Sequence, residues 1–127
     1  MTRIVLDAGA LLALERMDRA MWLDVRSVAL RAGEVIVPST ALAQAWRGVA
    51  SQAMLARALQ HCLIAAFEPI ARAIGELCGR TRTSDICDAH VALVAATGGD
   101  VLYTSDPADM LRLISAIGAR RPKIIRC

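Results

Sequence analysis

Short apolar runs alternate along the chain with longer segments of helical spacing, and this alternation restricts the fold more than any other feature. The runs, each long enough for a short strand, cover residues 3–6, 34–37, 62–67, 101–104 and 122–126. The helical segments cover residues 8–14, 18–32, 39–49, 52–60, 70–78, 86–96 and 107–117. Strands that alternate with helices are typical of a parallel sheet covered by helices on both faces. We therefore predict an α/β fold in which residues 1–127 form a single domain around a parallel sheet of four to five strands.

Local signals predict where some of these helices begin and which faces they bury. Ser39 or Thr40 follows a proline and is expected to cap the third helical segment. The spacing places Trp46 and Val49 on the buried face of that helix. The segment 86–96 is almost wholly apolar, so we expect it to be a buried helix.

Composition excludes several classes of protein. Hydrophobic residues make up 56% of the chain, which is too many for a disordered segment. No charge-free stretch approaches the ~18–20 residues of a membrane-spanning helix, and Asp7 interrupts the first apolar run too early for a signal peptide. The 4 cysteines form no C-x-x-C pair, so we expect reduced thiols in a cytoplasmic protein and no zinc site.

Five aspartates are concentrated at the predicted helix starts. Asp7 and Asp106 each follow a strand, Asp85 and Asp88 begin the apolar helix, and Asp109 lies one turn after Asp106. Any one of them is explained as a helix cap, but capping does not explain why they gather at the edge where parallel strands end. Carboxylates in close proximity repel unless a cation neutralises them, and oxygen ligands favour Mg²⁺ or Mn²⁺.

If the five aspartates share one pocket, the rest of the surface carries an excess of positive charge. The chain carries 15 basic and 12 acidic residues, and every basic residue except Lys123 is an arginine. Arginine binds phosphate through two parallel hydrogen bonds, although a net charge of +3 alone does not indicate a nucleic-acid partner. An acidic metal site within a basic surface suits phosphodiester hydrolysis, in which a metal activates a water and stabilises the phosphate.

Four segments together resemble the PIN-domain ribonucleases, specifically the VapC-type toxins of bacterial toxin–antitoxin pairs. These segments are IVLDAGAL at 4–11, VP through LAQAWRG at 37–48, TSDICDAH at 83–90 and YTSDPAD at 103–109. They span nearly the whole chain in the family's order. The resemblance implies a three-layer α/β/α fold, Mg²⁺- or Mn²⁺-dependent hydrolysis of RNA, a homodimer and a small antitoxin as partner.

The resemblance also assigns roles to individual residues. The family's catalytic, metal-binding aspartates correspond to Asp7, Asp88 and Asp106. Asp85 is an extra acid beside this set, Asp109 lies behind it, and the hydroxyls of Thr104 and Ser105 can steady the last aspartate or a water.

Gln44 occupies the position where the family usually has a glutamate. An amide oxygen can bind a metal, but it carries no charge and cannot act as a base. Either Asp85 restores the fourth negative charge and the nuclease is active, or metal affinity falls. In the second case the chain is a weak nuclease, or a non-catalytic PIN-fold protein that binds RNA or a partner.

The remaining candidates concern RNA, histidines and rival folds. Arg47, Arg80 and Arg82 are the candidate RNA contacts, and a solvated surface position without a partner is the alternative for each. His61 and His90 are expected to serve packing rather than catalysis. A receiver domain is disfavoured because it needs an acidic pair at the first strand and a late lysine within the fold. Here Asp7 stands alone, and the only lysine is Lys123, close to the end of the sequence. A nucleotide-binding enzyme is disfavoured because the chain contains neither G-x-G-x-x-G nor a P-loop.

The high apolar content also predicts a surface that binds another protein. Candidates on the early helices for a dimer or antitoxin groove are Met17, Met21, Trp22, Met54 and Leu55; packing in the core is the alternative for each of them.

Overall fold

The computed structural model describes residues 1–118 and 120–127. Its strands are β1 (Arg3–Leu6), β2 (Glu34–Pro38), β3 (Cys62–Ala65), β4 (Val101–Thr104) and β5 (Lys123–Arg126). Its α-helices are α1 (Ala8–Glu15), α2 (Arg19–Leu30), α3 (Ser39–Ala45), α4 (Ala53–Leu59), α5 (Ala71–Thr81), α6 (Ile86–Gly98) and α7 (Pro107–Ile117). Two short 3-10 helices, η1 (Ala50–Gln52) and η2 (Glu68–Ile70), precede α4 and α5.

All five strands are parallel and lie in the order β3-β2-β1-β4-β5. The first strand is therefore central, and the chain turns to opposite sides of it in its first and second halves. This reversal of direction lies between β1 and β4, where parallel α/β sheets place their ligand sites. The predicted parallel sheet is confirmed.

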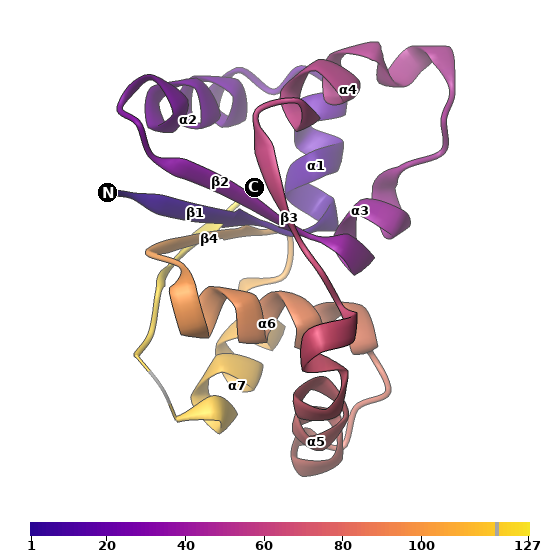
Figure 1. Cartoon of the computed structure of the whole chain (residues 1–127), viewed down its shortest axis with the longest axis vertical. Coiled ribbons are helices and arrows are strands. Elements are labelled where there is room, and N and C mark those ends of the chain that lie inside the picture. Colours follow the sequence, from indigo (N-terminus) through magenta and orange to yellow (C-terminus); the bar gives the residue numbers. More distant parts are fainter. Residues whose placement is uncertain (119) are drawn as a thin grey trace.

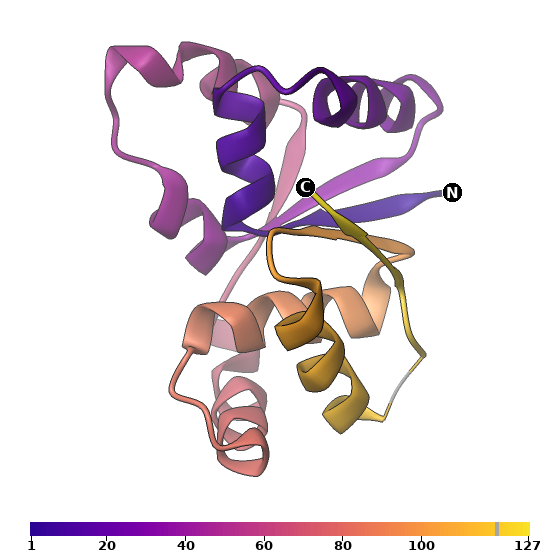
Figure 2. The same cartoon turned by 180° about the vertical axis from the view of Figure 1, so that it is seen from behind.

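Helices cover both faces of the sheet and form a three-layer arrangement (Figure 1, Figure 2). One apolar cluster joins α1, α2 and α4 to the sheet, with Leu11 and Leu14 fully buried at its centre. The other cluster joins α5, α6 and α7 to the opposite face around Leu77, Leu102 and Leu113. The sheet is thus shielded on both faces, as apolar parallel strands require.

The third helix is shorter than its sequence pattern predicts. It ends at Ala45, so Trp46 and Val49 lie outside it, with 39% and 53% of their surfaces exposed. The side chain of Gln52 replaces the missing helical hydrogen bonds. Its Oε1 accepts from the backbone N–H of Arg47 (2.8 Å), and its Nε2 donates to the carbonyl of Ala45 (2.8 Å).

The predicted cap of this helix is also wrong. Pro38 holds the N-cap position, and neither following hydroxyl caps the helix. Ser39 Oγ instead accepts from the backbone N–H of Phe67 (3.1 Å), and Thr40 Oγ1 forms a hydrogen bond with His90 Nδ1 (2.8 Å). Both hydroxyls satisfy polar groups on neighbouring elements, which sequence spacing does not reveal.

Other boundaries differ by a few residues. The strand predicted over 62–67 ends at Ala65, and the helices predicted to end at 78 and 96 continue to Thr81 and Gly98. The helix predicted over 52–60 is divided into η1 and α4. The buried α6 is confirmed, and its His90 is completely buried, consistent with packing rather than catalysis. Within the described ranges, no helix is both long and apolar enough to cross a lipid bilayer.

Candidate functional site

Asp7 is anchored between two strand ends at the switch in strand order. It follows β1 directly and caps α1, because its Oδ1 accepts from the backbone N–H of Ala10 (2.9 Å). Its Oδ2 accepts from the backbone N–H of Ser105, beyond β4 (3.2 Å). The side chain is only 6% exposed, so both carboxylate oxygens are held in fixed directions at this edge.

Asp106 and Asp109 lie at the start of α7, directly after Ser105, whose backbone N–H donates to Asp7. Asp106 caps this helix, with 3.4 Å between its Oδ1 and the backbone nitrogen of Asp109. Its own backbone N–H donates to Oγ1 of the fully buried Thr104 (3.0 Å). The Thr104 hydroxyl therefore holds the backbone of Asp106 at the end of β4.

Asp85 and Asp88 reach the same region from the start of α6. Asp85 caps the helix, and its Oδ1 accepts from the backbone N–H of Asp88 (3.0 Å). Burial raises the pKa of Asp88 to about 7, with further contributions from the charge of Asp85, a hydrogen bond to it, and the charges of Asp7 and Asp109. These four acids from three segments therefore share one electrostatic environment.

This environment provides the right ligand type for a hard divalent cation, but not a finished ligand cage. The side chains gathered here are aspartates, and Mg²⁺ and Mn²⁺ favour such carboxylate oxygens as ligands. Across residues 1–118 and 120–127, no group of three or more His, Cys, Asp and Glu side chains has the arrangement of a metal site. Both oxygens of Asp7 and one oxygen of Asp85 accept backbone hydrogen bonds in this conformation. The carboxylate oxygens are the type of ligand that such an ion prefers. To bind it, the more exposed aspartate side chains would have to change their rotamers.

Gln44 lies on α3, which packs against both α1 and α6. Its side chain is exposed to solvent. Its helix therefore adjoins the elements that carry Asp7 and Asp88, while Gln44 itself adds no negative charge.

The three arginines predicted to contact RNA are all exposed, but they differ in their contacts. Arg47 Nη1 donates to the carbonyls of Ala43 (3.2 Å) and Trp46 (2.7 Å), so part of its guanidinium closes the end of α3. Arg80 lies in the last turn of α5, and Arg82 follows that helix with a left-handed φ of 55°. Their role in RNA binding stays a prediction.

Two residues with structural roles were not identified from the sequence. Gly9, in the first turn of α1, lies so close to Ser105 that a side chain would not fit. A glycine two residues after a strand-ending aspartate, in a helix, is the signal that could have indicated it. Gln52 is 3% exposed and organises the end of α3, but no sequence signal distinguishes it from a surface glutamine.

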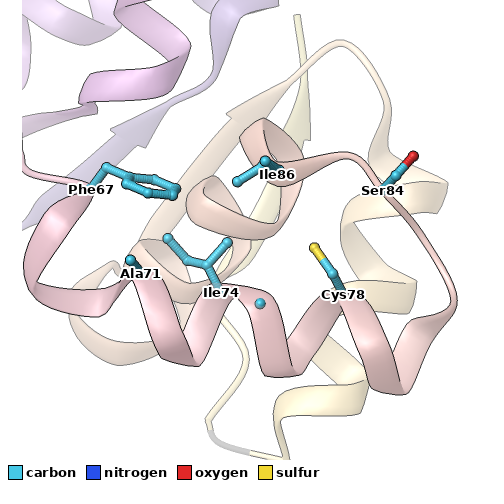
Figure 3. A pocket seen from close by; sticks show the side chains of 7 residues that line it. Phe67, Ala71, Ile74, Cys78, Ser84 and Ile86 are labelled. Carbon is cyan, nitrogen blue, oxygen red and sulfur yellow. The ribbon is translucent and has the colours of Figure 1, made fainter.

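Two cavities have no carboxylate in their lining. One, of about 330 Å³, lies between α5 and the start of α6 (Figure 3). Its lining is mostly apolar and consists of Phe67, Ala71, Ile74, Gly75, Cys78, Ser84 and Ile86. The other, of about 480 Å³, lies between α2 and α4 and is lined by Trp22, Val25, Arg26, Ala29, Leu30, Met54, Ala58 and His61.

The second cavity separates the predicted partner-binding residues into two groups. Trp22 and Met54 line it. Met17, which precedes α2 in the sequence, is 61% exposed. Met21 and Leu55 are 2% and 0% exposed, so the core alternative holds for these two and they are not part of a partner surface. Both belong to the apolar core beneath α2 and α4.

Comparison with known proteins establishes the fold of this chain. No protein-family model matches it, and no curated protein matches its sequence. Its structure is similar to a chain in the crystal structure of VapBC2 from Rickettsia felis bound to a DNA fragment from their promoter. The match covers 99% of each chain with a TM-score of 0.70, at 14% sequence identity. The predicted three-layer PIN-like fold is thereby confirmed.

Proposed function

We propose that this chain, with its PIN-like fold, is a metal-dependent endoribonuclease that acts as the toxin of a toxin–antitoxin pair. The observation that carries the proposal is the gathering of Asp7, Asp85 and Asp109 around Asp88 near the switch point of the sheet, where burial and then the charges of the other three raise the pKa of Asp88. Such mutual repulsion is unfavourable without a bound cation. The similarity to a VapBC2 chain supports the same class of function.

Asp7, Asp88 and Asp106 would hold Mg²⁺ or Mn²⁺, with Asp85 and Asp109 adding negative charge. A bound ion of this kind supplies a nucleophilic water and neutralises charge on the scissile phosphate. The backbone N–H groups of Ala10 and Ser105 hold the carboxylate of Asp7, so it would be the ligand with the most fixed orientation.

The surrounding residues would orient the substrate. Exposed Arg80 and Arg82 lie just before the helix that carries Asp88, and they would bind phosphates on either side of the cleaved bond. Thr104 holds the backbone of Asp106 and thereby keeps this carboxylate at the end of β4. Aromatic residues are only 3% of the chain, so base stacking is not the main contribution to binding.

A non-catalytic PIN-fold protein is the second candidate. Gln44 in place of an acid favours it, as does the lack of a preformed ligand cage in the described part of the chain. In this case the chain would bind RNA or a partner protein and would not cleave RNA.

Cleavage of a labelled RNA pool by purified protein separates the two candidates. We expect cleavage with Mn²⁺ or Mg²⁺, none with EDTA, and loss of cleavage in Asp7→Asn, since asparagine still caps the helix without a charge. Glu76→Gln, an exposed acid on α5, is the matched control and should cleave normally. Silence of the wild type followed by cleavage in Gln44→Glu would indicate a disabled nuclease. Silence of both would refute the proposal.

An antitoxin would bind the cavity between α2 and α4. Its lining combines Trp22, Leu30 and Met54 with the charge of Arg26, which suits an amphipathic helix that carries an acidic residue. A second copy of the chain is expected to form a homodimer through other helices.

A further inference from the structure

Gly9 occupies a position where its own backbone conformation does not require glycine. It is the second residue of α1, and glycine is a poor helix former. The glycines with positive φ are Gly48 and Gly118, so Gly9 has an ordinary helical backbone. The requirement for glycine must therefore come from its surroundings.

Ser105 fills the space that a side chain on residue 9 would occupy. A Cβ atom there would overlap Ser105 Oγ, and it would lie 2.5 Å from Ser105 Cβ and 3.3 Å from Asp7 Oδ1. Rotation of the serine side chain could move its Oγ, but its Cβ moves only with the backbone. Any larger residue at position 9 must therefore displace the chain at residue 105.

That stretch of backbone also supplies a hydrogen bond to the candidate site. The N–H of Ser105 donates to Asp7 Oδ2 (3.2 Å), and Asp106 is the next residue. A shift of Ser105 would weaken the hold on Asp7 and move the carboxylate of Asp106 away from it. The separation of these two aspartates thus depends on the close contact between α1 and the β4–α7 junction.

We infer that Gly9 and Ser105 are a pair of positioning residues, which set the spacing of Asp7 and Asp106 for a divalent ion. The inference rests on the proposed function, because it concerns the same site. Gly9 acts through Ser105, and neither the glycine nor the serine side chain is assigned a bond to the ion.

The test measures Mn²⁺ binding to protein stripped of metal with EDTA and then freed of EDTA, using the electron paramagnetic resonance signal of free Mn²⁺. Gly9→Ala should weaken binding ~10-fold, as expected when residues behind metal ligands are changed. In the Ser105→Gly background, which removes the conflicting atoms, Gly9→Ala should cause no further loss. The Ser105→Ala background retains the Cβ atom and should not rescue binding. Gly75→Ala, on α5, is the matched control, since a Cβ atom added to Gly75 would meet no other atom within 4 Å.

Urea unfolding of the same variants measures the steric contact without any metal. Gly9→Ala should lower the urea midpoint in wild type and raise it in Ser105→Gly. An unchanged Mn²⁺ affinity in Gly9→Ala, or an equal loss in both backgrounds, would overturn the inference while leaving the proposed function intact. If the wild type binds no Mn²⁺, the proposed metal chemistry fails and the inference fails with it.

Discussion

Replacing Asp88 with asparagine should make the metal-free protein more stable at neutral pH. The pKa of Asp88 is about 7 in the folded chain, against an ordinary value of 3.8. Folding therefore favours the protonated form of this carboxyl. The contribution of this carboxyl to the free energy of unfolding is most favourable below about pH 4, where it is protonated in both states. That contribution becomes unfavourable as the pH rises toward 7. An asparagine at this position does not titrate, so the variant would lack this pH dependence.

The size of the effect follows from the same values. A pKa raised from 3.8 to about 7 corresponds to at most ~4 kcal/mol of destabilisation above pH 7. Asp88 is partly exposed, so solvent screening reduces this to ~1–2 kcal/mol. Asp88→Asn should recover that amount at pH 8 and almost none of it at pH 4.

Urea unfolding in EDTA at pH 4, 6 and 8 would measure this difference. Glu76→Gln, also a loss of one negative charge, is the control and should show no comparable gain. With Mn²⁺ in excess the order should reverse, because only the wild type gains stability from binding the ion. The reasoning is refuted if Asp88→Asn is no more stable than wild type at pH 8 in EDTA, or if their difference is the same at all three pH values.

Three further changes test other parts of the structure. Asp7→Asn should reduce RNA cleavage at least ~100-fold, because it removes charge from the centre of the site, and Mn²⁺ titration should show weaker binding; normal turnover would argue against this site. Leu77→Ala should lower the free energy of unfolding by ~2–5 kcal/mol in urea, since Leu77 is 0% exposed between α5 and its neighbours, and a loss below ~1 kcal/mol would contradict the packing described. Leu30→Asp should leave unfolding unchanged, since Leu30 is 76% exposed, yet preserve RNA cleavage in the presence of an antitoxin that silences the wild type; full silencing of the variant would place that partner elsewhere.

The elements of this fold could be predicted because their signals are local. Apolar runs and helical spacing located the strands and helices, and aspartates at helix starts located the candidate site. The parallel arrangement then placed Asp7 beside the junction that carries Asp106, and the hydrogen bond from Ser105 to Asp7 is consistent with this. Local signals were sufficient where an aspartate caps the helix that it begins, as Asp7, Asp85 and Asp106 do.

The errors come from contacts between different elements of the chain. The end of α3 depends on a buried glutamine beyond it, and Thr40 pairs with His90, 50 positions later. The role of Gly9 depends on an atom of Ser105, across the switch in the sheet. Periodicity carries no information on such contacts, because they arise only once the helices and strands have packed.

The central position of β1 has a consequence for the order in which the protein acquires its shape during synthesis. The first strand is made before its two neighbours and can pair with β2 while β2 pairs with β3, but its other edge has no partner until β4 has been made. Asp7 receives its hydrogen bond from Ser105 only after that pairing, so a partly synthesised chain has every residue of its first strand and still lacks an ordered site. A long sequence separation between paired strands slows folding, and it delays the ordering of the candidate site until β4 and the start of α7 have emerged.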